Sequence, residues 1–134
     1  YINDSKATNA HAAAASLTSF ESVVWILGGL LKGVDISDLV SQFAPRLRGA
    51  VVIGADRAEI VEAFAKLAPN VPLVEISGGE SVMSQAVSSA SKLASAGDVV
   101  LLAPAAASMD QFLNYQQRGD RFIEAVSKLV GDSQ

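Results

Sequence analysis

The sequence predicts an α/β fold, a doubly wound and mostly parallel sheet with helices on both faces. Short apolar runs recur along the chain without alternating with polar residues, which is typical of strands buried on both faces of a parallel sheet. Segments with helical periodicity lie between these runs, and such an alternation requires right-handed crossovers. Each run stops at small or polar residues, as at the ligand-binding edge of Rossmann-like sheets.

Five runs are predicted as strands. They are Tyr1-Ile2, Val23–Leu27, Ala50–Ile53, Leu73–Ile76 and Val99–Leu102. The first helix is expected to open at Thr8 or Asn9 and to continue to Leu17. Three later helices are predicted from apolar stripes, namely Ile60, Val61, Phe64 and Leu67; Val82, Met83, Ala86, Val87, Ala90, Leu93 and Ala94; and Phe122, Ile123, Val126, Leu129 and Val130.

Local signals refine these helices. Asp56-Arg57-Ala58-Glu59 fits a capping box, in which Asp56 caps the helix that follows it. Ser108-Met109-Asp110-Gln111 fits a second box with Ser108 as the cap. Gly119 follows Arg118 and is expected to break the C-terminal segment into two helices, because glycine disfavours a helix interior.

Composition bounds the class of protein. With 134 residues, of which 50% are hydrophobic and 18% charged, the chain predicts one folded domain over residues 1–134. The net charge of −4 and the absence of a basic cluster argue against nucleic acid as a partner. No apolar run is long enough to span a bilayer and no basic leader is seen, so no membrane partner is expected. The lack of cysteine excludes disulfides and fits a cytoplasmic location.

No self-sufficient active site is visible. The chain has no Gly-x4-Gly-Lys-[Ser/Thr] phosphate loop, and the spacing from Gly28 to Gly33 does not fit one. The single histidine, His11, has no Cys or second His with which to form a metal site, so no metal ligand is predicted.

Three positions follow predicted strand ends and could bind an anion. Lys6 stands where the first helix opens, and the unpaired N–H groups there attract negative charge. Lys32 lies in a glycine-flanked loop, where an ammonium would bind a carboxylate or phosphate. Ser108 precedes another helix N-terminus. Each also has a structural interpretation, since Ser5, Thr8, Asn9 and Ser108 can be plain helix caps and loop lysines are usually solvated.

Three stretches carry a resemblance to a known family. They are Asn3-Asp4-Ser5-Lys6-Ala7-Thr8-Asn9, Gly28-Gly29-Leu30-Leu31-Lys32-Gly33, and Ala107-Ser108-Met109-Asp110-Gln111-Phe112 with Arg118-Gly119 behind it. Together they resemble the C-terminal domain of the Mur ligases, ATP-dependent enzymes of peptidoglycan and cell-wall synthesis, and within that family the members that add D-glutamate. The resemblance covers the chain end to end, but only the last of three domains.

The resemblance implies a role for each matching residue. It assigns D-glutamate binding to Thr8, Lys32, Ser108, Met109 and Tyr115, and nucleotide binding to Asp4 and Lys6. Within it, Lys32 holds the side-chain carboxylate of D-glutamate and Asp4 contacts the ribose of ATP. Tyr115 and Ala103 depart from the family, where many members have Phe and Ser.

The resemblance also implies partners and a reaction. The whole enzyme would use ATP and Mg²⁺, bound mainly by the central domain, to join D-glutamate to UDP-N-acetylmuramoyl-L-alanine. The N-terminal and central domains of the same enzyme are the expected partners, in a monomer, and this domain alone is expected to be inactive. The alternatives are a stand-alone α/β ligand-binding or interaction module, and the matching domain of another Mur ligase.

Overall fold

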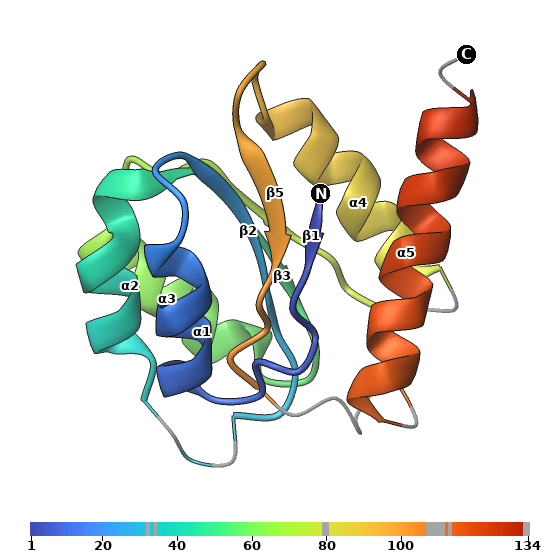
Figure 1. Cartoon of the computed structure of the whole chain (residues 1–134). Coiled ribbons are helices and arrows are strands. Elements are labelled where there is room, and N and C mark those ends of the chain that lie inside the picture. Colours follow the sequence, from blue (N-terminus) through green and yellow to red (C-terminus); the bar gives the residue numbers. More distant parts are fainter. Residues whose placement is uncertain (32, 34, 79–80, 107–111, 113, 133–134) are drawn as a thin grey trace.

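The computed structural model describes residues 1–31, 33, 35–78, 81–106, 112 and 114–132 (Figure 1). Its centre is a five-stranded sheet with the order β1-β5-β2-β3-β4. All four pairings of neighbouring strands are parallel. The strands are β1 (Ile2–Asn3), β2 (Val23–Gly28), β3 (Leu47–Ile53), β4 (Leu73–Glu75) and β5 (Val99–Leu102).

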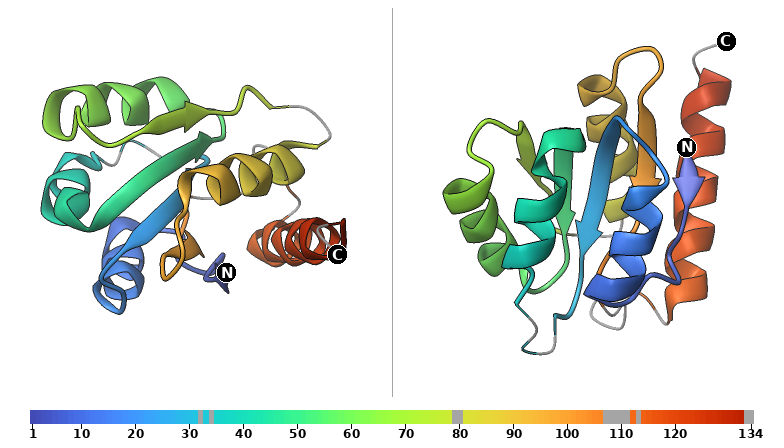
Figure 2. Two further views of the ribbon diagram at one scale, coloured as in Figure 1. Left: turned by 90° about the horizontal axis from the view of Figure 1, so that it is seen from above. Right: turned by 60° about the vertical axis from the view of Figure 1, so that its left-hand side comes forward.

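Helices cover both faces of this sheet (Figures 1 and 2). The elements are α1 (Ala10–Thr18), α2 (Ser37–Phe43), the 3₁₀ turn η1 (Ala44–Arg46), α3 (Arg57–Leu67), α4 (Val82–Leu93) and α5 (Tyr115–Asp132). One apolar core lies between the sheet and α1, α2 and α3, and a second lies between the sheet and α4 and α5. The doubly wound α/β prediction is therefore confirmed.

Alternate residues of the central strand serve the two cores. Trp25 and Leu27 belong to the core under α1, α2 and α3, whereas Val24 and Ile26 belong to the core under α4 and α5. All four are completely buried. A strand buried on both faces has no polar alternation, which is why β2 reads as one continuous apolar run.

Two predicted apolar stripes are wrong in part. All seven residues of the α4 stripe are buried or packed against the second core. In α3, however, Leu67 is 41% exposed, and in α5 Ile123 and Val130 are about half exposed. Both helices bury a narrower stripe than predicted, completed by the small residues Ala63 and Ala125.

The helix α2 was not predicted. It is short, and Asp35, two residues before its first residue Ser37, carries the signal that could have found it. The Asp35 side chain accepts hydrogen bonds from the Ser37 amide at 2.9 Å and from the Ser37 hydroxyl at 2.6 Å. An aspartate that bonds the backbone two residues on is a common way to start a helix or turn.

The expected break at Gly119 is wrong, because α5 continues through this residue. A β-carbon at Gly119 would lie 3.0 Å from Asn3 Nδ2 and 3.2 Å from Ser5 Cβ. Glycine is present because α5 packs closely against the end of β1, and the close packing offsets the low helix propensity. The tilted contact between the rings of Tyr1 and Phe122, 6.5 Å between centroids, belongs to the same packing.

Gly28 ends β2 in a conformation that other residues rarely adopt, with φ of +123°. A β-carbon there would stand 1.9 Å from the Ile53 carbonyl oxygen of β3. Its N–H donates to the Pro104 carbonyl at 2.9 Å, beyond the end of β5. The neighbouring strand therefore requires glycine at this position.

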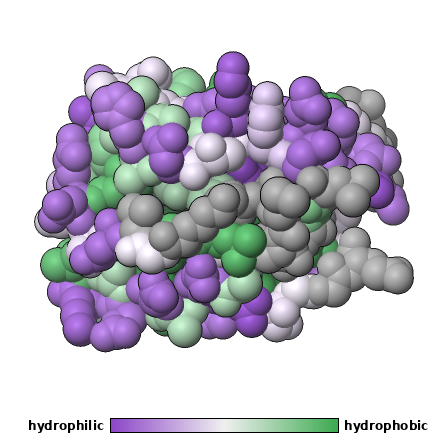
Figure 3. All heavy atoms as spheres, turned by 90° about the horizontal axis from the view of Figure 1, so that it is seen from below, coloured by the Kyte–Doolittle hydropathy of each residue, from purple (hydrophilic) through white to green (hydrophobic). Residues whose placement is uncertain are grey.

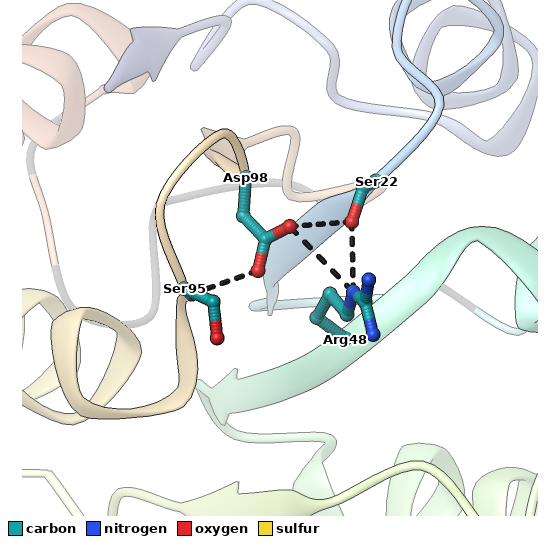
Figure 4. A network of polar contacts seen from close by, with 4 residues as sticks. All are labelled: Ser22, Arg48, Ser95 and Asp98. Atoms are coloured by element: carbon teal, nitrogen blue, oxygen red, sulfur yellow. Dashed lines mark hydrogen bonds and ion pairs between the residues drawn. The ribbon is translucent and has the colours of Figure 1, made fainter.

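A polar network joins the amino-terminal ends of three strands (Figure 4). The Asp98 carboxylate accepts hydrogen bonds from the Ser22 hydroxyl at 2.6 Å and the Ser95 amide at 2.8 Å. Arg48 stands at the register shift between β2 and β3, and its Nε lies 3.6 Å from Asp98 Oδ1. The Ser22 hydroxyl, then the Ser95 N–H and the Arg48 guanidinium, lower the pKa of Asp98 against the raising effect of burial.

We predict that Asp98→Asn lowers stability in a pH-dependent way. Because the folded-state pKa lies below the ordinary value of 3.8, the ionised carboxylate stabilises the fold above that value. This stabilisation is lost as the pH falls through the lowered folded-state pKa. Urea titrations of both proteins should show a difference in the free energy of unfolding at neutral pH that shrinks towards about pH 2. A difference that stays constant over this range would contradict the assignment.

Candidate functional site

The carboxyl ends of the parallel strands share one edge of the sheet, which faces downward in Figure 1. Seen from below, the described part of this face is hydrophilic around much of its rim, while apolar residues reach the surface further in (Figure 3). Open parallel sheets bind ligands outside these strand ends. The candidate site is therefore sought in the loops that follow β1, β2, β3 and β5.

The loop after β1 carries Asp4, Lys6 and Thr8, and its backbone is held firmly. The Asp4 N–H donates a hydrogen bond to the Leu102 carbonyl of β5 at 2.8 Å, and the Ala7 N–H donates one to the Asp4 carbonyl at 2.9 Å. The Ala7 carbonyl in turn accepts from the Ala105 N–H at 2.9 Å. These bonds tie the loop after β1 to the loop after β5.

The cap of α1 is Asn9. Its side chain accepts a hydrogen bond from the Ala12 N–H at 2.9 Å. This confirms one of the three structural interpretations offered for this stretch, and it leaves Thr8 and Ser5 for other uses. Lys6 is exposed, and its ammonium has no ion-pair partner within the part of the chain that the structure describes.

A buried arginine of α5 joins the two loops. Arg118 is 1% exposed. Its guanidinium donates to the Ser5 carbonyl at 2.8 Å, the Ser5 hydroxyl at 3.0 Å and the Ala106 carbonyl at 3.0 Å. The Ser5 hydroxyl then donates to the Tyr115 carbonyl at 2.6 Å. One planar group thus fixes the loop after β1, the loop after β5 and the first turn of α5 relative to one another.

Sequence reasoning quoted Arg118 in a motif but gave it no structural role. A signal for burial was present, because Arg118 precedes Phe122 by four residues on the apolar stripe of α5. Side chains four apart lie on the same face of a helix. A charged residue on the buried face of a helix is expected to be surrounded by several hydrogen-bond acceptors, because an unpaired buried charge is costly.

A cavity of about 240 Å³ opens between the loop after β1 and the first turns of α5. Asp4, Lys6 and Tyr115 line it, with Ser5 and Asp120 among their neighbours. The structure therefore brings together three of the residues that the sequence singled out. Thr8 is half-buried and is not among the residues that line this cavity.

Three of the predicted site residues, Lys32, Ser108 and Met109, lie outside the described residues. The same is true of the capping box that begins at Ser108. The described helix α5 begins at Tyr115, with the Asn114 side chain accepting from the Gln117 N–H at 2.8 Å. Ala103, which departs from the family at a predicted pocket position, is completely buried in the core.

Backbone strain marks the loop after β5. Ala105 has φ of +60°, the one positive value among the described residues other than glycine. This conformation costs an L-residue roughly 1–2 kcal/mol. The Ala105 N–H bond to Ala7 holds it there, directly before the segment that contains Ser108. Strain of this kind is concentrated at functional sites.

The predicted capping box at Asp56 is wrong. Asp56 does stand before the first residue of α3, but its side chain makes no hydrogen bond to that helix. The carboxylate instead accepts from the Leu31 N–H at 2.7 Å, in the loop after β2. Local sequence pattern could not reveal this, because the partner is 25 residues away in the chain.

Among the described residues, no group of three or more His, Cys, Asp or Glu side chains could hold a metal ion. His11 is exposed on α1.

None of the helices in the described part of the chain has the length and apolar character needed to cross a membrane.

The fold and the edge define an α/β domain of the class that binds ligands beyond the carboxyl ends of parallel strands. Residues 1–106 match the family described as the Mur ligase, glutamate ligase domain. Because this match covers most of its 134 residues, the chain belongs to that family.

Close relatives bear one name. A UDP-N-acetylmuramoylalanine–D-glutamate ligase of Thermobifida fusca is 57% identical over 132 residues, which are 98% of this chain and 28% of the relative. The ligase of the same name from Streptomyces coelicolor is 58% identical over 130 residues, 96% of this chain and 28% of the relative. That of Mycolicibacterium smegmatis is 47% identical over 98% of this chain and 33% of its own length. The chain spans between 28% and 33% of the length of these relatives.

We predict that Arg118→Ala destabilises this chain by roughly 2–4 kcal/mol, because it leaves buried carbonyls of Ser5 and Ala106 without their charged donor. Arg118→Lys should recover only part of the loss, since one ammonium cannot replace a planar fork. Urea unfolding can be followed through Trp25, the single tryptophan of the chain, which is fully buried.

Arg121→Ala provides the matched control on the same helix. Arg121 is exposed and pairs with Glu124 at 3.2 Å, so its loss should change the free energy of unfolding by less than about 0.5 kcal/mol. Equal effects of the two alanine substitutions would refute the anchoring role of Arg118.

Proposed function

We propose that this chain is the domain of a UDP-N-acetylmuramoylalanine–D-glutamate ligase that binds D-glutamate and part of ATP. The observation that carries the proposal is the cavity at the carboxyl edge, lined by Asp4, Lys6 and Tyr115 from opposite ends of the chain. Membership of the glutamate ligase domain family and the shared name of the relatives support it.

The proposed roles divide between two ligands. D-glutamate is bound by Thr8, Lys32, Ser108, Met109 and Tyr115. Asp4 and Lys6 bind the nucleotide, Asp4 through a ribose hydroxyl and Lys6 through the phosphates. An exposed ammonium without an ion-pair partner among the described residues suits Lys6 to an incoming anion.

ATP would transfer its γ-phosphoryl group to the carboxylate of UDP-N-acetylmuramoyl-L-alanine and leave as ADP. The amine of D-glutamate would then attack the activated carbonyl, forming the amide with release of phosphate and a proton. The residues of this chain bind and orient D-glutamate so that its amine faces the activated carbonyl. We assign Mg²⁺ and most of the ATP site to a central domain of the same enzyme, in the cytoplasm. The described residues offer no cluster that would hold the metal.

The rival functions are weaker. A stand-alone interaction module needs no exposed lysine beside a cavity, and no observation of the described residues favours it. Another Mur ligase would use a different amino acid, whereas the relatives with 47–58% identity carry the D-glutamate name. These observations favour the D-glutamate ligase.

We predict that Lys32→Ala in the complete enzyme lowers the specificity constant for D-glutamate about 10- to 150-fold. Loss of a charge-assisted contact to the side-chain carboxylate costs roughly 1.5–3 kcal/mol. Steady-state kinetics with each substrate varied in turn should show near wild-type constants for ATP and for the UDP substrate. D-Glutamine, which lacks the charge, should be affected much less if it reacts.

Lys66→Ala is the control for the loss of a lysine. Lys66 stands in the last turn of α3, where it pairs with Glu62 at 2.9 Å on an exposed surface. This variant should leave all three specificity constants unchanged. An unchanged constant for D-glutamate in Lys32→Ala would remove the contact on which the proposed function depends.

A further inference from the structure

Asp56 connects two loops at the candidate edge through both its backbone and its side chain. Its N–H donates to the Gly29 carbonyl at 3.1 Å. Its Oδ2 accepts from the Leu31 N–H at 2.7 Å. Two hydrogen bonds in opposite directions therefore hold the loop after β2 against the start of α3.

The side-chain bond is made in place of a helix cap. A residue before the first turn of a helix normally accepts a hydrogen bond from one of the next backbone N–H groups, which stabilises the helix. The Asp56 carboxylate makes no such bond to α3. A charged acceptor makes a stronger hydrogen bond than a neutral one, and here that strength is directed at one amide of a neighbouring loop.

That loop is held at three described points. Gly28 is bonded to Pro104, Gly29 to the Asp56 backbone, and Leu31 to the Asp56 side chain. The Leu31 side chain is also buried in the core, 4% exposed. Asp56 provides two of the three hydrogen bonds, and the side-chain bond is the last one before Lys32 in the sequence.

We propose that Asp56 is a positioning residue for D-glutamate recognition, because its carboxylate fixes the backbone at Leu31, the residue directly before Lys32 in the sequence. This inference rests on the proposed function of Lys32. Asp56 does not itself contact the substrate. A binding group that follows a fixed stretch of backbone loses less entropy when its ligand arrives, and this is the contribution proposed for the Asp56 carboxylate.

The test uses Asp56→Ser in the complete enzyme. Serine can cap α3 but its hydroxyl is too short to replace the carboxylate at Leu31, so the variant separates the helix from the loop. We expect an approximately tenfold loss of the specificity constant for D-glutamate with near wild-type constants for ATP and the UDP substrate. Asp56→Asn, which keeps an oxygen acceptor, should stay within about threefold of wild type.

The double variant decides whether Asp56 acts through Lys32. In a Lys32→Ala background, Asp56→Ser should cost less than about a further twofold, because the group it positions is gone. A full tenfold loss in that background would overturn the inference. So would an unchanged D-glutamate constant in Asp56→Ser alongside a lowered one in Lys32→Ala, or an equal loss for ATP.

Asp98→Ser is the matched control at the opposite edge. Asp98 also accepts a backbone N–H, that of Ser95 at 2.8 Å, so its loss disturbs the fold without touching the site. It should leave the D-glutamate constant unchanged. Hydrogen exchange at the Leu31 amide, faster in Asp56→Ser than in wild type, reports the bond independently of activity; unchanged exchange would overturn the positioning role. Failure of Lys32→Ala alone to affect D-glutamate would instead identify the proposed function as wrong.

Discussion

The candidate site depends on one buried guanidinium. A charged group inside a protein is tolerated only when its donors are satisfied, and Arg118 meets this requirement with oxygen atoms from two separate loops. Because the guanidinium needs hydrogen-bond acceptors, the carbonyl groups of Ser5 and Ala106 both lie against it. The loops that carry Lys6 on one side and lead to Ser108 on the other therefore have a common anchor, and α5 is their support.

Gly119 makes that anchor possible. Arg118 reaches Ser5 because the adjacent position of α5 has no side chain to keep the helix away from β1. The cost in helix propensity falls on one residue of an 18-residue helix. The result is a cavity at the first turns of α5 with a carboxylate and an ammonium on its wall, and this ammonium has no ion-pair partner among the described residues.

The two edges of the sheet are built differently. At the amino-terminal edge, the compact network of Ser22, Arg48 and Asp98 joins the starts of β2, β3 and β5. At the carboxyl edge, hydrogen bonds run between loops, through Ala105 in a strained conformation and through Asp56 in place of a helix cap. The network at the amino-terminal edge stabilises the fold, whereas the hydrogen bonds at the carboxyl edge hold the loops that carry the candidate site residues.

Sequence reasoning recovered the strands and the main helices because both are recorded in local apolar patterns. It also indicated the edge at which Asp4, Lys6 and Tyr115 come together, since the carboxyl ends of parallel strands meet there by topology alone. It failed at Gly119 and Asp56, where local rules for glycine and for helix caps compete with partners far away in the sequence. The partner of Gly119 is the end of β1, and that of Asp56 is a single amide of the loop after β2. Such contacts leave no periodic signal.

We propose that the carboxyl edge of this domain receives the side-chain carboxylate of D-glutamate at Lys32. A crystal structure of the complete enzyme with D-glutamate and a non-hydrolysable ATP analogue measures this contact directly. The account predicts a separation of about 2.7–2.9 Å between Lys32 Nζ and a side-chain carboxylate oxygen of D-glutamate. A side-chain carboxylate bound by other residues, more than about 4 Å from Lys32 Nζ, would contradict it.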